Sequence, residues 1–116
     1  SLRYIDLRNI EVNSFIDLSY MFYNCTKLYS IDFTLYTRDN NNDFGVKDMK
    51  EMFYNCETLY QININVNRIS SYYINMSRLF YNCKSLKYVR NNFRHFYVND
   101  AKEMFYNCIK YESNVL

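Results

Sequence analysis

One tetrapeptide, Phe-Tyr-Asn-Cys, occurs four times in this chain. It stands at residues 22–25, 53–56, 80–83 and 105–108, so its cysteines lie 31, 27 and 25 residues apart. A motif that recurs at such a period is typical of stacked repeats, in which each unit buries its apolar side chains only against its neighbours. The spacing therefore predicts a solenoid, and solenoid proteins act mainly by presenting a long surface.

The repeats divide the chain into one partial unit and four longer ones. A chain of 116 residues is too short for two independent cores, so residues 1–116 are expected to form one domain. Residues 1–16 are interpreted as a partial repeat, and the later repeats are expected to begin near residues 17, 48, 75 and 100. Neither end has the polar unit that caps a solenoid, which indicates a piece of a longer protein. No apolar run in this segment reaches the roughly 18 residues that span a membrane.

The first half of each repeat has the pattern of a short amphipathic helix. In the second repeat Asp48 precedes the apolar residues Met49, Met52 and Phe53, and Glu51 has the spacing of a capping box. The candidate N-caps of the other repeats are Asp17, Asn75 and Asp100. The asparagine of each tetrapeptide tolerates a left-handed conformation and is expected to end the helix.

The second half of each repeat predicts a strand. The patterns Leu-x-x-Ile-x-Phe at residues 28–33 and Leu-x-x-Ile-x-Ile at residues 59–64 alternate in polarity with period two. Such strands lie parallel, about 4.8 Å apart, when the repeats stack. The predicted fold class is therefore α/β, with short parallel strands on one face of a solenoid and short helices on the other.

Together these patterns resemble a known family. The pattern Met-Phe-x-x-Cys-x-x-Leu at residues 52–59, followed by Ile-x-Ile at residues 62–64, is similar to the BspA-like leucine-rich repeats of surface proteins. The resemblance covers nearly the whole chain and implies a leucine-rich-repeat solenoid, here of about four repeats, that acts in adhesion or protein binding. The fourth repeat departs from the pattern, because Tyr111 replaces leucine and Asn114 replaces isoleucine.

Two residue types of the tetrapeptide are expected to form structural ladders. They are Phe22, Phe53, Phe80 and Phe105, and Cys25, Cys56, Cys83 and Cys108. One cysteine per repeat spreads the thiols over roughly 15 Å at sheet spacing, so they cannot surround one metal ion. Neighbouring thiols could form disulfides, but side chains that point the same way fit a row of buried free thiols better.

The tyrosines of the tetrapeptide allow two interpretations. Tyr23, Tyr54, Tyr81 and Tyr106 should form a column that is either an aromatic recognition strip or packing between repeats. The packing interpretation is favoured, with the hydroxyl groups reaching solvent or backbone.

The outward positions of the predicted strands are the best candidates for a binding surface. They are Tyr4, Asp6, Arg8, Ser30, Asp32, Thr34, Gln61, Asn63, Asn65, Tyr88, Arg90 and Asn92. In a solenoid such residues line one continuous face, which is where these proteins commonly bind. Their polar character with both charge signs suits a protein or glycan partner. The alternative is a sheet surface that is only solvated.

Charge is distributed unevenly along the chain. Residues 68–110 hold eight Lys or Arg against two acids, whereas residues 1–67 hold six against nine. A basic and aromatic cluster between residues 84 and 96 has the composition of nucleic-acid sites, but the net charge of only +2 argues against that partner. The asymmetry equally fits head-to-tail self-association along the solenoid.

Catalysis has little basis in the sequence. His95 is the only histidine, and no serine or cysteine motif near it suggests a nucleophile–base pair. No cofactor and no metal site are expected. The sequence therefore favours a non-enzymatic protein-binding or adhesion module at the cell surface or outside the cell. The alternative is a structural building block of a large assembly (a shell, fibre or cytoskeletal array) in a virion or inside a cell.

Overall fold

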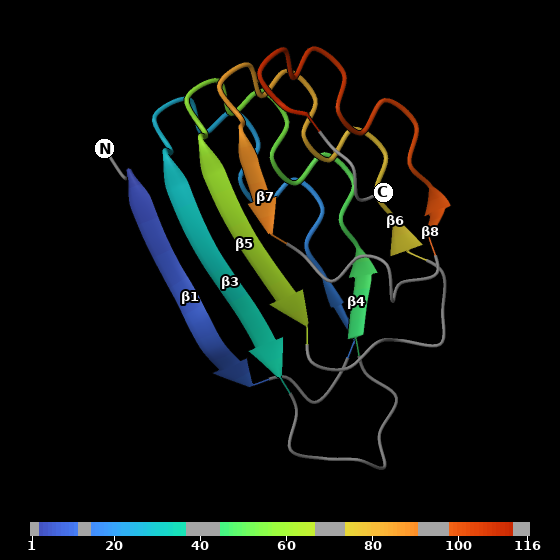
Figure 1. Ribbon diagram of the computed structural model, residues 1–116. Coiled ribbons are helices and arrows are strands. Elements are labelled where there is room, and N and C mark those ends of the chain that lie inside the picture. Colours follow the sequence, from blue (N-terminus) through green and yellow to red (C-terminus); the bar gives the residue numbers. More distant parts are fainter. Residues whose placement is uncertain (1–2, 12–14, 37–44, 67–73, 91–97, 113–116) are drawn as a thin grey trace.

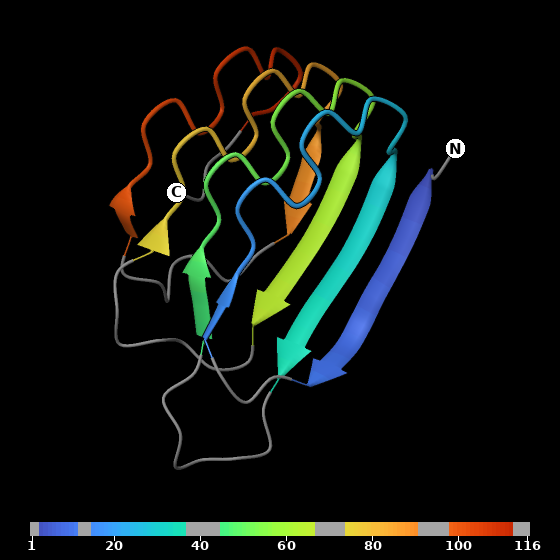
Figure 2. The same ribbon diagram turned by 180° about the vertical axis from the view of Figure 1, so that it is seen from behind.

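The protein is built from two four-stranded parallel β-sheets (Figures 1 and 2). The computed structural model describes residues 3–11, 15–36, 45–66, 74–90 and 98–112. Sheet A has the order β1 (Tyr4–Glu11), β3 (Ser30–Tyr36), β5 (Gln61–Val66) and β7 (Tyr88–Arg90). Sheet B has the order β2 (Phe15–Asp17), β4 (Gly45–Asp48), β6 (Ile74–Asn75) and β8 (Val98–Asp100). The parallel sheet expected from the sequence is confirmed.

Each of the first three repeats forms one coil, which consists of a sheet B strand, a turn segment and a sheet A strand. Coils one to three span residues 15–36, 45–66 and 74–90, while the described part of coil four, residues 98–112, holds β8 and its turn segment. Strand β1 precedes coil one. In Figure 1 the sheet B strands rise to the turn segments at the top of the molecule and the sheet A strands descend from them. The core lies inside the coils and is lined by apolar residues from every one of them.

The predicted helices are wrong. The described residues contain no helix, and the segments where helices were expected are chains of tight turns. The third residue after each candidate N-cap has a left-handed backbone, with φ of 61° at Tyr20, 52° at Glu51, 51° at Arg78 and 54° at Glu103. One residue with positive φ in each segment is incompatible with a right-handed helix.

The N–H groups of the turn segments explain why turns replace helices. Every second N–H donates to a carbonyl of the following coil, and the first two coils are joined by Leu18 to Asp48, Tyr20 to Lys50, Phe22 to Met52 and Asn24 to Tyr54, at 2.8 to 3.1 Å. The N–H groups between them close tight turns within the coil, as from Met21 to Leu18 and from Tyr23 to Tyr20. Nearly all the donors are thereby used, although a helix this short would leave its first four N–H groups unpaired.

The presumed N-caps have a related role. The Asp48 carboxylate accepts a hydrogen bond from the Lys50 N–H at 2.8 Å. The side chains of Asp17, Asn75 and Asp100 likewise each accept a hydrogen bond from the N–H group of the residue two positions later in the chain. This is an Asx turn and not a capping box. The N–H of Glu51, which a capping box would hold within its own segment, donates instead to the Ser77 carbonyl of coil three at 3.0 Å.

The four tetrapeptide asparagines are left-handed, as predicted, with φ between 59° and 63°. They also form a side-chain ladder that sequence reasoning missed. Asn55 Nδ2 donates to Asn24 Oδ1 at 2.9 Å, Asn82 to Asn55 at 2.6 Å and Asn107 to Asn82 at 2.7 Å. Asparagine thus satisfies a backbone requirement and joins the coils at the same position.

Phenylalanine and cysteine occupy two inner ladders. The Phe22, Phe53, Phe80 and Phe105 rings stack on one another, with centroids 5.3 to 5.6 Å apart. The thiols of Cys56, Cys83 and Cys108 each donate to the phenylalanine carbonyl of the preceding coil at 2.9 to 3.1 Å. All four cysteines are free, and Cys25, in coil one, is half-buried whereas the other three are buried.

Sheet B was not predicted from the sequence. Its strands are only two to four residues long, so the period-two signal is too short to detect. A sequence signal for these strands did exist. One or two positions before each candidate N-cap stands a β-branched residue, namely Ile16, Val46, Ile74 or Val98. These residues pair across the sheet, Ile16 with Val46 and Ile74 with Val98.

The Asn82 ladder gives a stability prediction. Asn82→Gly keeps a residue that accepts positive φ and removes two side-chain hydrogen bonds, so it should lower the free energy of unfolding by about 1–3 kcal/mol. Asn82→Ala should cost about 1 kcal/mol more, because alanine is strained in the left-handed region. Urea unfolding of the two variants checks both values. Equal losses would show that the backbone conformation does not matter there.

Buried thiols give a reactivity prediction. Burial raises the pKa of Cys56 to about 12 and also raises that of Cys83. At pH 8, Cys56 should therefore react with a disulfide reagent on the order of a thousandfold more slowly than an unperturbed thiol. Because its folded pKa lies above its ordinary value of 9.0, stability should fall as the pH rises from 9 toward 12. Site-resolved labelling by mass spectrometry tests this, with the unfolded chain as control, and fast labelling of native Cys56 would contradict it.

Candidate functional site

The predicted surface residues lie on the outer face of sheet A. Along β3 the apolar residues Ile31, Phe33 and Leu35 are buried, whereas Asp32 and Thr34 between them are partly exposed. The register aligns the outward residues in rows across the strands. The rows are Tyr4, Ser30, Gln61 and Tyr88; Asp6, Asp32, Asn63 and Arg90; and Thr34 with Asn65. Asn92 lies outside the described residues, as does His95.

Two of the predicted residues depart from a simple exposed row. Ser30 is only 6% exposed, because Gln61 covers it and donates to its hydroxyl at 3.1 Å. Arg8 lies beside a register irregularity between Leu7 and Ile10, so it has no direct partner on β3. The usable face is therefore formed by the first two rows, from β1 to β7.

The second row begins with two carboxylates side by side. Asp6 and Asp32 are direct cross-strand partners, an arrangement that is destabilising unless other groups neutralise it. The Arg8 guanidinium forms a forked ion pair with Asp6, at 2.6 and 2.8 Å, and its backbone N–H donates to Asp6 at 3.1 Å. These bonds lower the pKa of Asp6 to about 2. Asp32 accepts a hydrogen bond from the Tyr4 hydroxyl at 2.7 Å, which raises the pKa of Tyr4.

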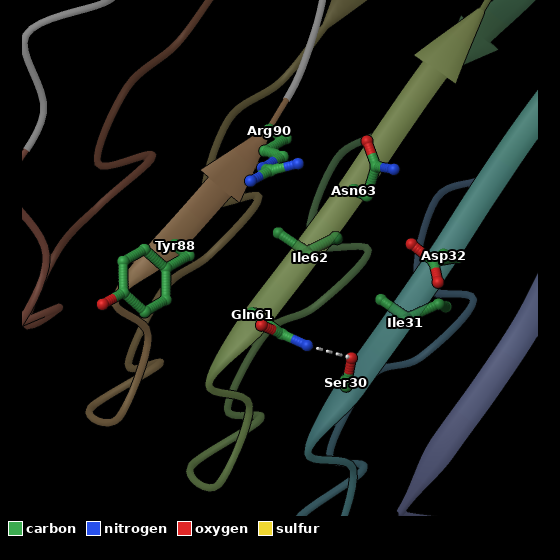
Figure 3. Close-up of a pocket in the computed structure, with 8 residues that line it drawn as sticks. All are labelled: Ser30, Ile31, Asp32, Gln61, Ile62, Asn63, Tyr88 and Arg90. Atoms are coloured by element: carbon green, nitrogen blue, oxygen red, sulfur yellow. Dashed lines mark hydrogen bonds between the residues drawn. The ribbon is translucent and has the colours of Figure 1, made fainter.

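The centre of the face is an open depression of about 360 Å³ (Figure 3). It is lined by Ser30, Ile31, Asp32, Gln61, Ile62, Asn63, Tyr88 and Arg90. Along its second row the side chains change from acidic Asp32 through neutral Asn63 to basic Arg90. Among the described residues the ion pairs are Arg8–Asp6 and Arg78–Glu103, so the Arg90 guanidinium has no ion pair there. The depression thus presents donors and acceptors with a charge gradient across three strands.

A second column of tyrosines borders this face and was missed in the sequence. The Tyr29 and Tyr60 rings stack with centroids 5.2 Å apart, and Tyr60 meets Tyr88 edge to face at 5.4 Å. Arg3 lies over the Tyr29 ring and Lys87 over the Tyr88 ring. The sequence signal for this column was a tyrosine directly after Leu28 and another directly after Leu59.

The tetrapeptide tyrosines lie on the turn segments. Their rings stack almost face to face, with centroids 4.7 to 4.8 Å apart and interplanar angles of 5° to 15°. A ring whose face is covered by the next ring cannot offer that face to a ligand, so the column favours the packing interpretation.

The outer face and the coils define a class: an all-β stack, within the described residues, that carries one polar, hollowed sheet face. The chain belongs to the family described as "Mycoplasma protein of unknown function, DUF285", which matches residues 3–116. No curated protein and no solved structure matches the chain. Within the described residues there is no helix long and apolar enough to cross a membrane.

The Asp6–Arg8 pair gives a pH prediction. The folded pKa of Asp6, about 2, lies below its ordinary value of 3.8, so the stabilisation is present above pH 3.8 and is lost as the pH falls through 2. Arg8→Ala should return the pKa of Asp6 toward 3.8, and Arg8→Lys should have a smaller effect because it keeps the charge without the fork. A carboxyl NMR titration measures these values. An unchanged Asp6 pKa in Arg8→Ala would refute the assignment.

Proposed function

We propose that the chain is a segment of a BspA-like leucine-rich-repeat solenoid and that it is a non-enzymatic protein-binding module. Its binding surface is the outer face of sheet A. The observation that carries this proposal is the depression of about 360 Å³ across β3, β5 and β7. Such a concave site with a few convergent polar groups is the usual form of a recognition surface.

The chemistry of the depression favours a protein partner. Asn63 and Gln61 offer amide groups at its floor, and Tyr88, which is 49% exposed, stands at its rim beside Arg90. Tyrosine and arginine are the residues most often found at the energetic centres of protein interfaces. The gradient from Asp32 to Arg90 selects a partner with the opposite order of charges, which fixes its orientation as well as its identity.

The family resemblance supports a location at the cell surface. The Met-Phe-x-x-Cys-x-x-Leu repeat is the pattern of surface and adhesion proteins, and adhesion needs a partner on another cell or on a host molecule. Tyr4 and Tyr88 on the outer face of sheet A are 50% and 49% exposed, so a partner can reach them.

The partner can be found and the site tested in one series. A photo-crosslinking amino acid in place of Asn65, an exposed residue of β5 two positions beyond Asn63, should link the partner on intact cells of the source organism. With the purified partner, Asn63→Arg should weaken binding at least tenfold, because a long charged side chain would fill the floor of the depression. Titration calorimetry measures the affinities.

Ser85→Arg is the matched control, since it adds the same side chain to the turn segment of coil three. It should change the affinity less than twofold. Equal affinities for wild type and Asn63→Arg would exclude this face as the binding site, whatever protein had been linked. Tyr88→Ala should also weaken binding, because truncating an exposed aromatic residue that the partner buries can remove about 2 kcal/mol of binding free energy.

A further inference from the structure

The second row on the outer face of sheet A changes sign across the strands. It passes from Asp32 on β3 through Asn63 on β5 to Arg90 on β7, and each residue is the direct cross-strand partner of the next. Figure 3 shows the Asn63 side chain between the Asp32 carboxylate and the Arg90 guanidinium. The charge gradient is therefore perpendicular to the strands and parallel to the axis along which the coils stack.

Both charged ends of this row can accept a partner of opposite charge. Arg90 is exposed and forms no ion pair with any described residue. Asp32 accepts a hydrogen bond from the Tyr4 hydroxyl at 2.7 Å, but no cation pairs with it within the described ranges. Asp6, the remaining carboxylate of the row, is already paired with Arg8. A complementary ligand must place an anionic group at Arg90 and a cationic group at Asp32, whereas a polyanion would be repelled by Asp32.

The spacing of the row restricts the shape of that ligand. Neighbouring strands lie about 4.8 Å apart, so Asp32 and Arg90 are about 10 Å apart with Asn63 midway. A helix presents residues i and i+7 on one face about 10.5 Å apart, with residue i+3 or i+4 between them. An extended chain presents residues on one face only every 6.7 Å or about that, so its side chains fall out of step with the row. A helix is therefore the better match.

The first row can contact the flank of such a helix. Gln61 and Tyr88 lie two residues before Asn63 and Arg90, which places the first row about 6.7 Å from the second along the strands. A helix with its side chains is about 10–12 Å wide, so it covers both rows. Tyr88 is 49% exposed and thus adds an aromatic contact beside the charged one.

We propose that the partner of the outer face binds through a helical segment that lies across β3, β5 and β7. An acidic side chain of this helix pairs with Arg90, a basic side chain seven positions away pairs with Asp32, and a polar residue between them contacts the Asn63 amide. This inference rests on the proposed binding function and adds the shape and charge pattern of the bound segment. A helix in a groove is a common mode of recognition, and here opposite charges would fix its position.

Stapled peptides can test this proposal before the partner is known. The test peptide is a lactam-stapled helix with Glu, Gln and Lys at positions i, i+4 and i+7, on one face. Its isomer has the same composition, but Lys is moved to position i+5, on the opposite side of the helix. The staple is needed because a free helix of about 15 residues is only marginally stable in water.

NMR titration of the isotope-labelled chain measures the affinities. The test peptide should bind roughly fivefold more tightly than its isomer and should shift the Asn63 side-chain amide and Arg90 Nε–H resonances. Arg90→Asp and Asp32→Arg should each weaken its binding by a similar factor, because one charge of the peptide then meets a like charge. Lys84→Asp is the matched control: it makes the same charge change at an exposed position on the turn segment of coil three and should change the affinity less than twofold.

The double variant Asp32→Arg/Arg90→Asp gives a directional test. It reverses the charges of the row, so the test peptide should bind again with its direction reversed. A spin label at the peptide N-terminus, before the Glu, should broaden resonances near β7 in the wild type and near β3 in the double variant. Unchanged circular dichroism would show that the variants fold, and the comparison of the two isomers on wild type needs no variant.

Several results would overturn the proposal. Equal affinities of the two isomers for wild type, or unchanged binding of the test peptide by Arg90→Asp, would exclude the charged helix. Tighter binding of an extended, proline-containing isomer would identify a strand-like segment instead, and tighter binding of an oligouronate would identify an acidic glycan.

The binding function of the face has its own test, which is the effect of Asn63→Arg on the purified partner. A partner that is sensitive to Asn63→Arg but not to Arg90→Asp would leave that function standing and exclude the helix. Discrimination between the peptide isomers, together with a partner that is insensitive to Asn63→Arg, would do the reverse.

Discussion

The hydrogen bonds that join alternate N–H groups of one turn segment to carbonyls of the next are the interaction on which this structure depends. They exist only because two residues in each segment, for example Tyr20 and Asn24, adopt positive φ. A left-handed residue at these two places keeps the chain flat and directs every second N–H toward the neighbouring coil. The turn segments then behave as a third hydrogen-bonded layer beside the two sheets, although their backbone is not extended.

The side-chain ladders follow from this backbone arrangement. Once equivalent residues lie one coil apart, an aromatic ring stacks on its counterpart, as Tyr54 does on Tyr81 at 4.7 Å. An asparagine meets another asparagine, and a thiol meets a carbonyl. Each ladder requires the same residue in successive coils, which is why the tetrapeptide recurs without change. A single exposed tyrosine or a single buried cysteine would have no counterpart in the next coil and would therefore form no ladder.

The outer face of sheet A obeys the opposite rule. Its second row holds Asp6, Asp32, Asn63 and Arg90, four positions with three kinds of chemistry. Side chains on this face point to solvent and not to the core, so packing does not restrict their type. The chain is repetitive where coils contact each other and varied on the outer face of sheet A, and this contrast supports the proposal that the face is the recognition surface.

Much of this could be read from the sequence. The recurrence at 25 to 31 residues determined the repeats, the period-two pattern of residues 28–33 and 59–64 determined sheet A and its register, and Asn24 and its counterparts marked left-handed positions. The spacing of Leu18, Met21 and Phe22 could not separate a helix from a chain of turns, since both direct the same positions inward. That choice was decided by tertiary structure, because the N–H groups of Glu51 and Phe53 find their acceptors in another coil 26 residues away. The depression on sheet A likewise arises only when coils lie side by side, since its lining comes from strands that are distant in sequence.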